Sequence, residues 1–176
     1  MNETAITMLT PLKRHAPRRL AIVFWIGRRL ALGRVRLLAS IHFARWAVVT
    51  AFPDGGDGER LHHPYLYFEG DFAGPWERYL EAFAEVMPNR LDAIWGTSYG
   101  YPGAVPVERL KAYVRRNQFA ANHHWCAYPR VTPNEILSAQ RVAAALERFR
   151  RRAAELDAPA FKAAYDAFLT SVQRDL

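Results

Sequence analysis

Histidine, arginine, aspartate and tyrosine side chains in the middle of the chain are the residue types that could carry chemistry. The candidate histidines are His42, His62, His63, His123 and His124. Adjacent residues of a strand point to opposite faces, so neither adjacent pair can chelate a metal, and the sequence spacings typical of structural zinc sites do not occur. We favour His124 as the functional histidine, because in a strand it would share a face with Cys126 and Tyr128.

Arg45 is the charged residue with the most apolar sequence neighbours. It could anchor an anion or an oxyanion inside a cavity. The alternative is a structural ion pair with Asp71 or Glu69, which we prefer because an unpaired buried charge is costly. Asp71 and Glu69 could conversely act as an acid–base pair, although two carboxylates on one strand face more often serve solvation or pairing.

The chain has a single cysteine, Cys126, which excludes an intramolecular disulfide and fits a reducing, cytoplasmic compartment. A catalytic thiol needs a base, and His124 would lie about 7 Å away along the strand, too far to activate it directly. We therefore interpret Cys126 as a buried thiol. The glycine-rich segment 96–103 carries no nucleotide-binding motif.

The hydrophobic pattern predicts which elements hold these residues. We expect strands at 40–52, 65–72 and 122–130, and helices after Pro75 and at 107–119. A capping box of Thr132 and Glu135 should begin a further helix that runs to about Ala154, and Asp157 should cap a last helix. Segment 91–99 stays open between a short strand and irregular structure. Strands mixed with helices and joined by hairpins favour an α+β fold, with an antiparallel sheet and helices on one face, preceded by a cationic amphipathic N-terminal helix.

The first two strands should pair as a hairpin and divide their side chains between two faces. The face under the helices would carry Trp46, Val48, Leu66, Phe68 and Phe72. The other face would carry Phe43, Arg45, Tyr65, Tyr67, Glu69 and Asp71, with Arg45 opposite Asp71. A face that is half aromatic and half charged suits a dimer partner or a ligand cavity.

Positive charge is concentrated near the N-terminus. Residues 1–40 hold eight basic residues and one acidic residue, whereas the rest of the chain is neutral. We therefore divide the chain into a basic and apolar arm at 1–36 and an α+β domain at 37–176. The apolar run 20–26 lies between two arginine pairs and is too short to span a bilayer. The second arginine pair and the missing cleavage site argue against a signal peptide.

Three interpretations of the arm stay open. An interfacial helix could place Phe24 and Trp25 in the headgroup region while four arginines, Arg18, Arg19, Arg28 and Arg29, meet anionic lipid. The helix could instead pack on the domain or on a partner, with its arginines in solvent. Nucleic acid is the third and least favoured partner, because the arm has few aromatic residues among its basic ones.

A resemblance to a known protein family lies in three segments of the chain. They are IHFARWAVV at 41–49, YLYFEGDFAGPWERYLEAFAEVMP at 65–88 and IWGTSYGYPG at 94–103. From about residue 36 onward, the chain resembles small bacterial proteins of the dimeric α+β barrel (ferredoxin-like) type. The resemblance implies a sheet whose open face meets a second sheet. Distant relatives include haem-binding dye-decolourising peroxidases and chlorite dismutases, and cofactor-free monooxygenases. The peroxidase motif Gly-x-x-Asp-Gly is not matched at 54–58, where Asp54 replaces the first glycine.

Two functions from different classes follow. The first is a non-catalytic module that forms a homodimer or joins a larger assembly through its sheet face, and docks on an anionic membrane or an acidic partner through its arm. It needs no cofactor and would be cytoplasmic, at a membrane surface if the arm binds lipid. The second is an oxidoreductase, haem-dependent or cofactor-free, acting on an apolar small molecule with His124, Arg45, Asp71 and Tyr67. In its haem version His124 would bind the cofactor.

Overall fold

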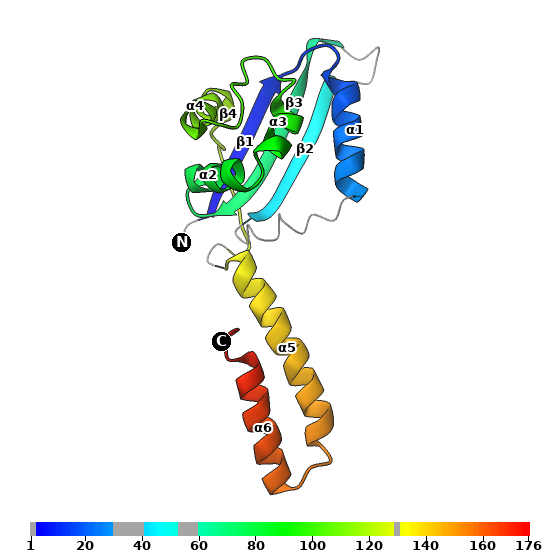
Figure 1. The fold of residues 1–176 in the computed structure, drawn as a ribbon, viewed down its shortest axis with the longest axis vertical. Helices are drawn as coiled ribbons and strands as arrows, with labels where there is room; N and C mark the ends of the chain where they lie inside the picture. Colours follow the sequence, from blue (N-terminus) through cyan, green and yellow to red (C-terminus); the bar gives the residue numbers. More distant parts are fainter. Residues whose placement is uncertain (1–2, 30–40, 53–59, 129–130) are drawn as a thin grey trace. The chain divides into compact units, whose positions relative to one another are not determined.

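The structure, a computed structural model, describes residues 3–29, 41–52, 60–128 and 131–176. The chain divides into two compact units, Met1–Arg130 and Val131–Leu176. The first unit contains a sheet and four helices, and the second is a pair of helices (Figure 1). Each unit is described separately below.

The sheet of the first unit has four antiparallel strands. They are β1 (Glu3–Pro11), β2 (Ile41–Ala51), β3 (Arg60–Ala73) and β4 (Gln118–Phe119), in the spatial order β2-β3-β1-β4. The neighbours pair antiparallel throughout, β2 with β3, β3 with β1 and β1 with β4. The expected α+β class with an antiparallel sheet is therefore confirmed.

Helices lie over one face of this sheet. They are α2 (Trp76–Val86), α3 (Pro88–Trp95) and α4 (Val107–Asn117), while α1 (Ala16–Arg29) runs beside β2 (Figure 1). Side chains that alternate along the strands point toward these helices and form the core, including Ile6 and Met8 of β1 and Leu66 and Phe68 of β3. The division of β2 and β3 into a core face and an outer face is as expected, since Trp46 pairs with Phe68 and Val48 with Leu66.

Gly70 shows why this core tolerates two neighbouring phenylalanines on one strand. It is buried between Phe68 and Phe72, and a Cβ atom at this position would lie 3.2 Å from the Phe72 ring and 3.2 Å from the backbone carbonyl of Phe43. The missing side chain leaves the space that the two rings occupy.

The N-terminal residues are not an arm, which corrects our division of the chain. Residues 3–11 form the central strand β1, which pairs with β3 over nine residues and also carries β4. The physical reason is an alternation of inward side chains, because Ile6, Met8, Thr10 and Leu12 are all buried. The boundary between the units lies at 130/131 rather than near residue 36. Residues 30–36 of the expected arm lie outside the described residues.

The expected strand at 122–130 is also wrong. β4 ends at Phe119, and residues 120–128 form neither helix nor strand; Pro129 and Arg130 lie outside the described residues. His123, His124 and Trp125 are all exposed, so this segment offers no alternation of buried and exposed side chains for a sheet to use. Segment 91–99, which was left open, lies largely in α3.

The second unit is an antiparallel helical hairpin, α5 (Pro133–Ala153) and α6 (Ala158–Val172). The predicted capping box is confirmed, since the Glu135 amide donates to the Thr132 hydroxyl and the Thr132 amide donates to the Glu135 carboxylate. The predicted cap of α6 is confirmed as well, because the Asp157 carboxylate accepts from the Ala160 amide.

Candidate functional site

The face of the sheet opposite the helices carries the mixed aromatic and charged set that the sequence predicts. We call it the open sheet face and define it by residues Phe43, Arg45, Tyr65, Tyr67, Glu69 and Asp71. Phe43 is 43% exposed, and the four residues contributed by β3 are half-buried. Large side chains therefore remain accessible along two neighbouring strands of the first unit.

Arg45 lies opposite Glu69, not opposite Asp71 as expected. The register of the β2–β3 pair shifts between Val49 and Ala51, and from Val49 back to Phe43 it is continuous and places Phe43 opposite Asp71. The Arg45 guanidinium makes an ion pair with Glu69, with 3.0 Å between Nη2 and Oε2, and it lies over the Tyr67 ring at 5.6 Å from the centroid. The Arg45 side chain is 64% exposed, so in the single chain it is a solvated cation held by Glu69 and Tyr67.

The structure gathers three of the four residues of the predicted oxidoreductase site, because Arg45, Tyr67 and Asp71 share the open sheet face. His124 comes from the irregular segment 120–128, so the alignment of His124, Cys126 and Tyr128 on one strand face is not formed. The Cys126 sulfur instead accepts from the Tyr128 amide at 3.4 Å. A catalytic or haem-binding role for His124 stays a prediction.

Two of the remaining histidines, His62 and His63, pack against rings. His62 and His63 lie with their ring centroids 4.5 Å apart, and His63 also contacts Tyr99 at 5.8 Å. Among the residues that the structure describes, no group of three or more histidine, cysteine, aspartate or glutamate side chains could hold a metal ion.

Helix α1 forms a second accessible surface. Its inner side packs into the core through Ala16 and Leu20, both fully buried, and through Phe24, whose ring lies 6.2 Å from that of Trp46. Packing of this helix on the domain, one of the three interpretations of the arm, is therefore what the structure shows. Phe24 belongs to the core contact and not to the outward surface where we expected it.

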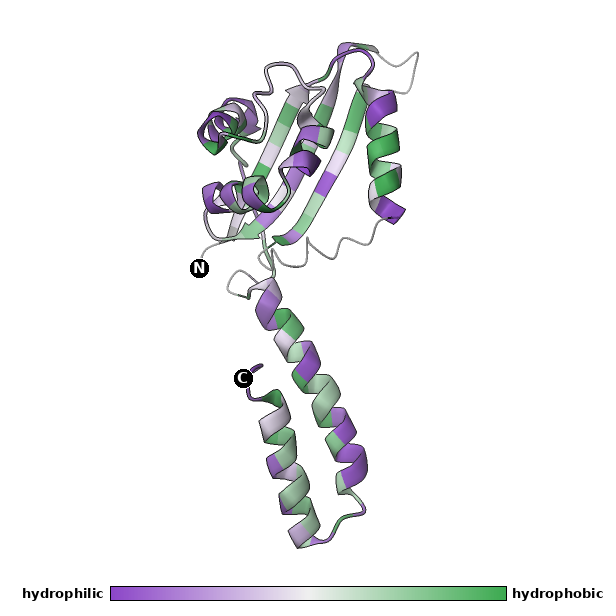
Figure 2. Cartoon of the chain, viewed as in Figure 1, coloured by the Kyte–Doolittle hydropathy of each residue, from purple (hydrophilic) through white to green (hydrophobic). Residues whose placement is uncertain are grey.

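The outer side of α1 is apolar in the middle and basic at both ends. We call it the α1 stripe and define it by residues Arg18, Ile22, Trp25, Ile26 and Arg29. Ile22 is 60% exposed, Trp25 58% and Ile26 42%, and both arginines are exposed. Figure 2 shows this helix with a hydrophobic middle between hydrophilic turns. Apolar residues occupy both the inner and the outer side of α1, so the cationic amphipathic character expected of this helix is not confirmed.

Our sequence reasoning missed Ile22 and Ile26 as surface residues. The spacing shows that positions 18, 22, 25, 26 and 29 follow one side of a helix, but it does not show which side faces outward. The Arg29 guanidinium lies over the Trp25 ring, 5.0 Å from its centroid, which holds the indole on the outer surface.

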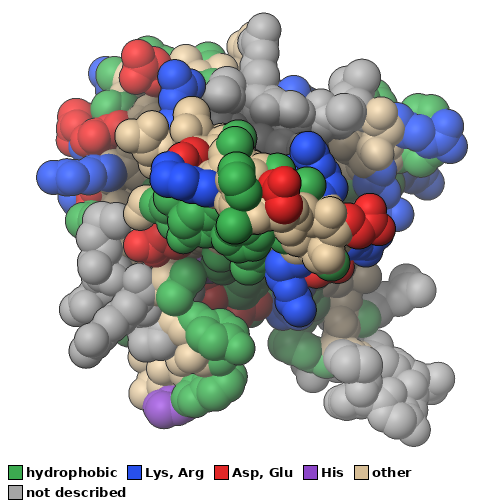
Figure 3. All heavy atoms as spheres, turned by 90° about the horizontal axis from the view of Figure 1, so that it is seen from below, with side chains coloured by type: hydrophobic (Ala, Val, Ile, Leu, Met, Phe, Trp, Pro, Cys, Tyr) green, Lys and Arg blue, Asp and Glu red, His purple; other side chains and the backbone are tan. Residues whose placement is uncertain are grey.

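Charge is distributed unevenly between the two units. The first unit holds 17 basic and 11 acidic residues, and the second holds seven and six. No acidic residue occurs between Glu3 and Asp54, a stretch that includes all of α1 and β2. The end of the hairpin turned toward the viewer in Figure 3 instead mixes basic, acidic and apolar side chains. The cationic character therefore belongs to the first unit, around α1.

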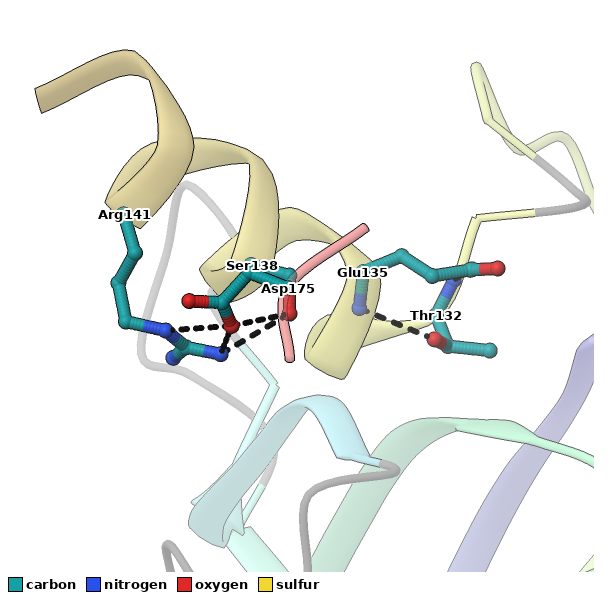
Figure 4. A network of polar contacts seen from close by, with 5 residues as sticks. All are labelled: Thr132, Glu135, Ser138, Arg141 and Asp175. Atoms are coloured by element: carbon teal, nitrogen blue, oxygen red, sulfur yellow. Dashed lines mark hydrogen bonds and ion pairs between the residues drawn. The ribbon is translucent and has the colours of Figure 1, made fainter. Parts of the chain in front are cut away.

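The hairpin carries a polar network that is structural. Asp175, just after α6, accepts from Arg141 Nε at 2.9 Å and from the Ser138 hydroxyl at 3.0 Å, and both donors belong to α5 (Figure 4). The hydrogen bond from Arg141 and that from Ser138 lower the pKa of the Asp175 carboxyl. The network ties the end of the chain to the first half of α5.

No helix among the described residues is both long and apolar enough to cross a bilayer. Comparison with protein-family models, with curated proteins and with solved structures found no match to this chain. The two accessible surfaces of the first unit, the open sheet face and the α1 stripe, are its candidate functional surfaces.

Proposed function

We propose that this protein is a non-catalytic interaction module that pairs with a second copy of itself through the open sheet face and docks on an anionic surface through α1. The observation that carries this proposal is the exposure of large side chains on the open sheet face, above all Phe43 and Arg45. Contiguous exposed aromatic side chains with charged neighbours are typical of interaction surfaces.

The topology supports pairing of this kind. The element order β1-α1-β2-β3 followed by helices and β4, with the spatial order β2-β3-β1-β4, agrees with a ferredoxin-like arrangement. The resemblance to dimeric α+β barrel proteins implies that the helix-free face of such a sheet meets the same face of a second subunit. The two-residue β4 makes one edge of this sheet unusually short.

The charges of the open sheet face suit an isologous contact. One cation, Arg45, and two carboxylates, Glu69 and Asp71, lie on the same face. In a two-fold contact each patch meets its own copy, so Arg45 of each subunit can approach an acidic residue of the other. Partial burial in such a contact would strengthen these pairs relative to their solvated state.

Sedimentation equilibrium of the full chain tests the assembly half of the proposal. We expect a dimer, and we expect the double variant Phe43→Ser, Arg45→Glu to dissociate. The matched control, Val105→Ser with Arg116→Glu, removes one exposed apolar side chain and reverses one exposed arginine away from the open sheet face, and should stay dimeric. A monomeric wild-type protein at all concentrations, or equal dissociation of both variants, would overturn this half.

A further inference from the structure

We infer that the α1 stripe binds the interfacial region of a phospholipid bilayer that carries anionic headgroups, with α1 lying parallel to the membrane plane. This inference rests on the proposed docking role of α1 and names its partner. It is argued from the geometry of one helix, α1, and from the charge of the segment around it.

The order of apolar and basic side chains along the α1 stripe fits the apolar and headgroup layers of a membrane surface. Its five residues follow one side of the helix over about 16 Å. The three apolar side chains occupy the centre, where they could enter the boundary between headgroups and acyl chains, which interfacial helices reach to a depth of about 5–10 Å. Trp25 suits this depth, because indole rings favour the level of the headgroups.

The charges fit anionic lipid at the same time. Arg18 and Arg29 stand at the two ends of the stripe, and Arg19 and Arg28 flank them. Among the described residues, no acidic side chain pairs with any of these four arginines. A guanidinium can bind a phosphate in bidentate fashion, so all four can contact lipid phosphates without first breaking an ion pair.

The inner side of α1 makes this surface ready to bind. Leu20 is fully buried, and Phe24 contacts the Trp46 ring, so the helix is already folded and oriented with the α1 stripe outward. Docking therefore requires no ordering of the helix, which otherwise opposes binding by a flexible segment.

A lipid surface accounts for the stripe better than nucleic acid does. Phosphate backbones recruit arginine, but two exposed isoleucines at the centre of the contact would find no apolar counterpart there. A base-stacking site needs an accessible aromatic face, whereas the Trp25 ring is covered on one side by Arg29.

The test measures cosedimentation of the full chain with vesicles of phosphatidylcholine alone and of phosphatidylcholine with about 30% phosphatidylglycerol. We expect at least about tenfold tighter binding to the anionic vesicles, weakened strongly by about 0.5 M NaCl. Brominated lipid should quench part of the tryptophan fluorescence, and the variant Trp25→Phe should lose that part. Circular dichroism checks that each variant is folded.

Matched pairs of variants separate this surface from general effects. Ile22→Ser with Ile26→Ser should weaken binding at least about tenfold, whereas Ile136→Ser with Leu137→Ser, a similar apolar loss on α5, should not. Arg18→Gln with Arg29→Gln should likewise weaken binding, whereas Arg150→Gln with Arg152→Gln, the same change in net charge on α5, should leave it nearly unchanged.

Three outcomes would overturn the inference, and they distinguish its failure from failure of the docking role itself. Equal effects of the α1 and α5 pairs would show that the contact is elsewhere or unspecific. The protein could bind a DNA duplex or polyglutamate tightly, retain that binding in the variant Ile22→Ser with Ile26→Ser, and fail to bind anionic vesicles. This outcome would refute binding to a membrane but retain an anionic macromolecule as the partner. Absence of binding to vesicles, duplex and polyglutamate would refute both the membrane inference and the proposed docking role of α1.

Discussion

Arg45 of β2 and Glu69 of β3 face each other across the sheet, with 3.0 Å between the guanidinium Nη2 and the carboxylate Oε2. Exposed pairs of this kind contribute about 0–1 kcal/mol to folding. We therefore expect the variant Arg45→Met to change the free energy of unfolding by no more than about 1 kcal/mol in urea titrations. Its effect should appear in assembly, as an increase of about tenfold in the dimer dissociation constant measured by sedimentation. A large loss of stability with unchanged assembly would mean that the pair serves the fold.

The same substitution at two glycines should have opposite effects. Gly70→Ala forces a methyl group against the Phe72 ring and the Phe43 carbonyl, and we expect a loss of about 1–3 kcal/mol in unfolding free energy. Gly27 lies inside α1, and nothing lies within 4 Å of its missing Cβ. Gly27→Ala should therefore stabilise the protein by about 0.5–1 kcal/mol through helix propensity. Thermal and urea unfolding measure both, and a shared sign would contradict the prediction.

The Asp175 network makes the hairpin sensitive to acid. The folded-state pKa of Asp175 lies below its ordinary value of about 3.8, chiefly because Arg141 donates to its carboxylate. A lowered folded pKa contributes stability that is present above the unfolded pKa and is lost as the pH falls through the folded pKa. The wild-type protein should thus protect amides of α6 better than Asp175→Asn at about pH 5, and the two should converge toward about pH 2. Hydrogen exchange resolved by residue measures this, and a constant gap would argue against it.

Lys111 of α4 is only 8% exposed and donates to Glu108 at 2.9 Å and to Glu81 of α2. Both carboxylates are at least half exposed, so water can solvate them without the lysine. We expect Lys111→Met to retain the thermal midpoint, because an apolar chain of similar length fills the same space. Glu81→Gln with Glu108→Gln should lower the midpoint, since it leaves a nearly buried ammonium without a charged partner. Thermal unfolding followed by circular dichroism decides, and the reverse order would refute this account.

Local patterns in the sequence were enough to predict several elements. The alternation at 65–72 identified the strand and its two faces, and Thr132 with Glu135 identified the start of α5. These signals are local, because a period-2 pattern or a capping box involves only neighbouring residues. The α+β class and the outward set on the open sheet face followed from them.

Other features depend on contacts between distant residues. The strand β1 was not predicted. Its inward residues alternate locally, but its central place in the sheet depends on pairing with β3, about 60 residues later. The register shift beyond Val49, which gives Arg45 its partner Glu69, has no signal in the local sequence pattern. The apolar run at 20–26 has hydrophobic residues on every side of a helix, so the sequence alone determined that α1 would be apolar and flanked by arginines. Only the tertiary structure decided that Leu20 and Phe24 turn inward and that Ile22, Trp25 and Ile26 remain outside, because the sheet can cover one side of a helix and leaves the other exposed.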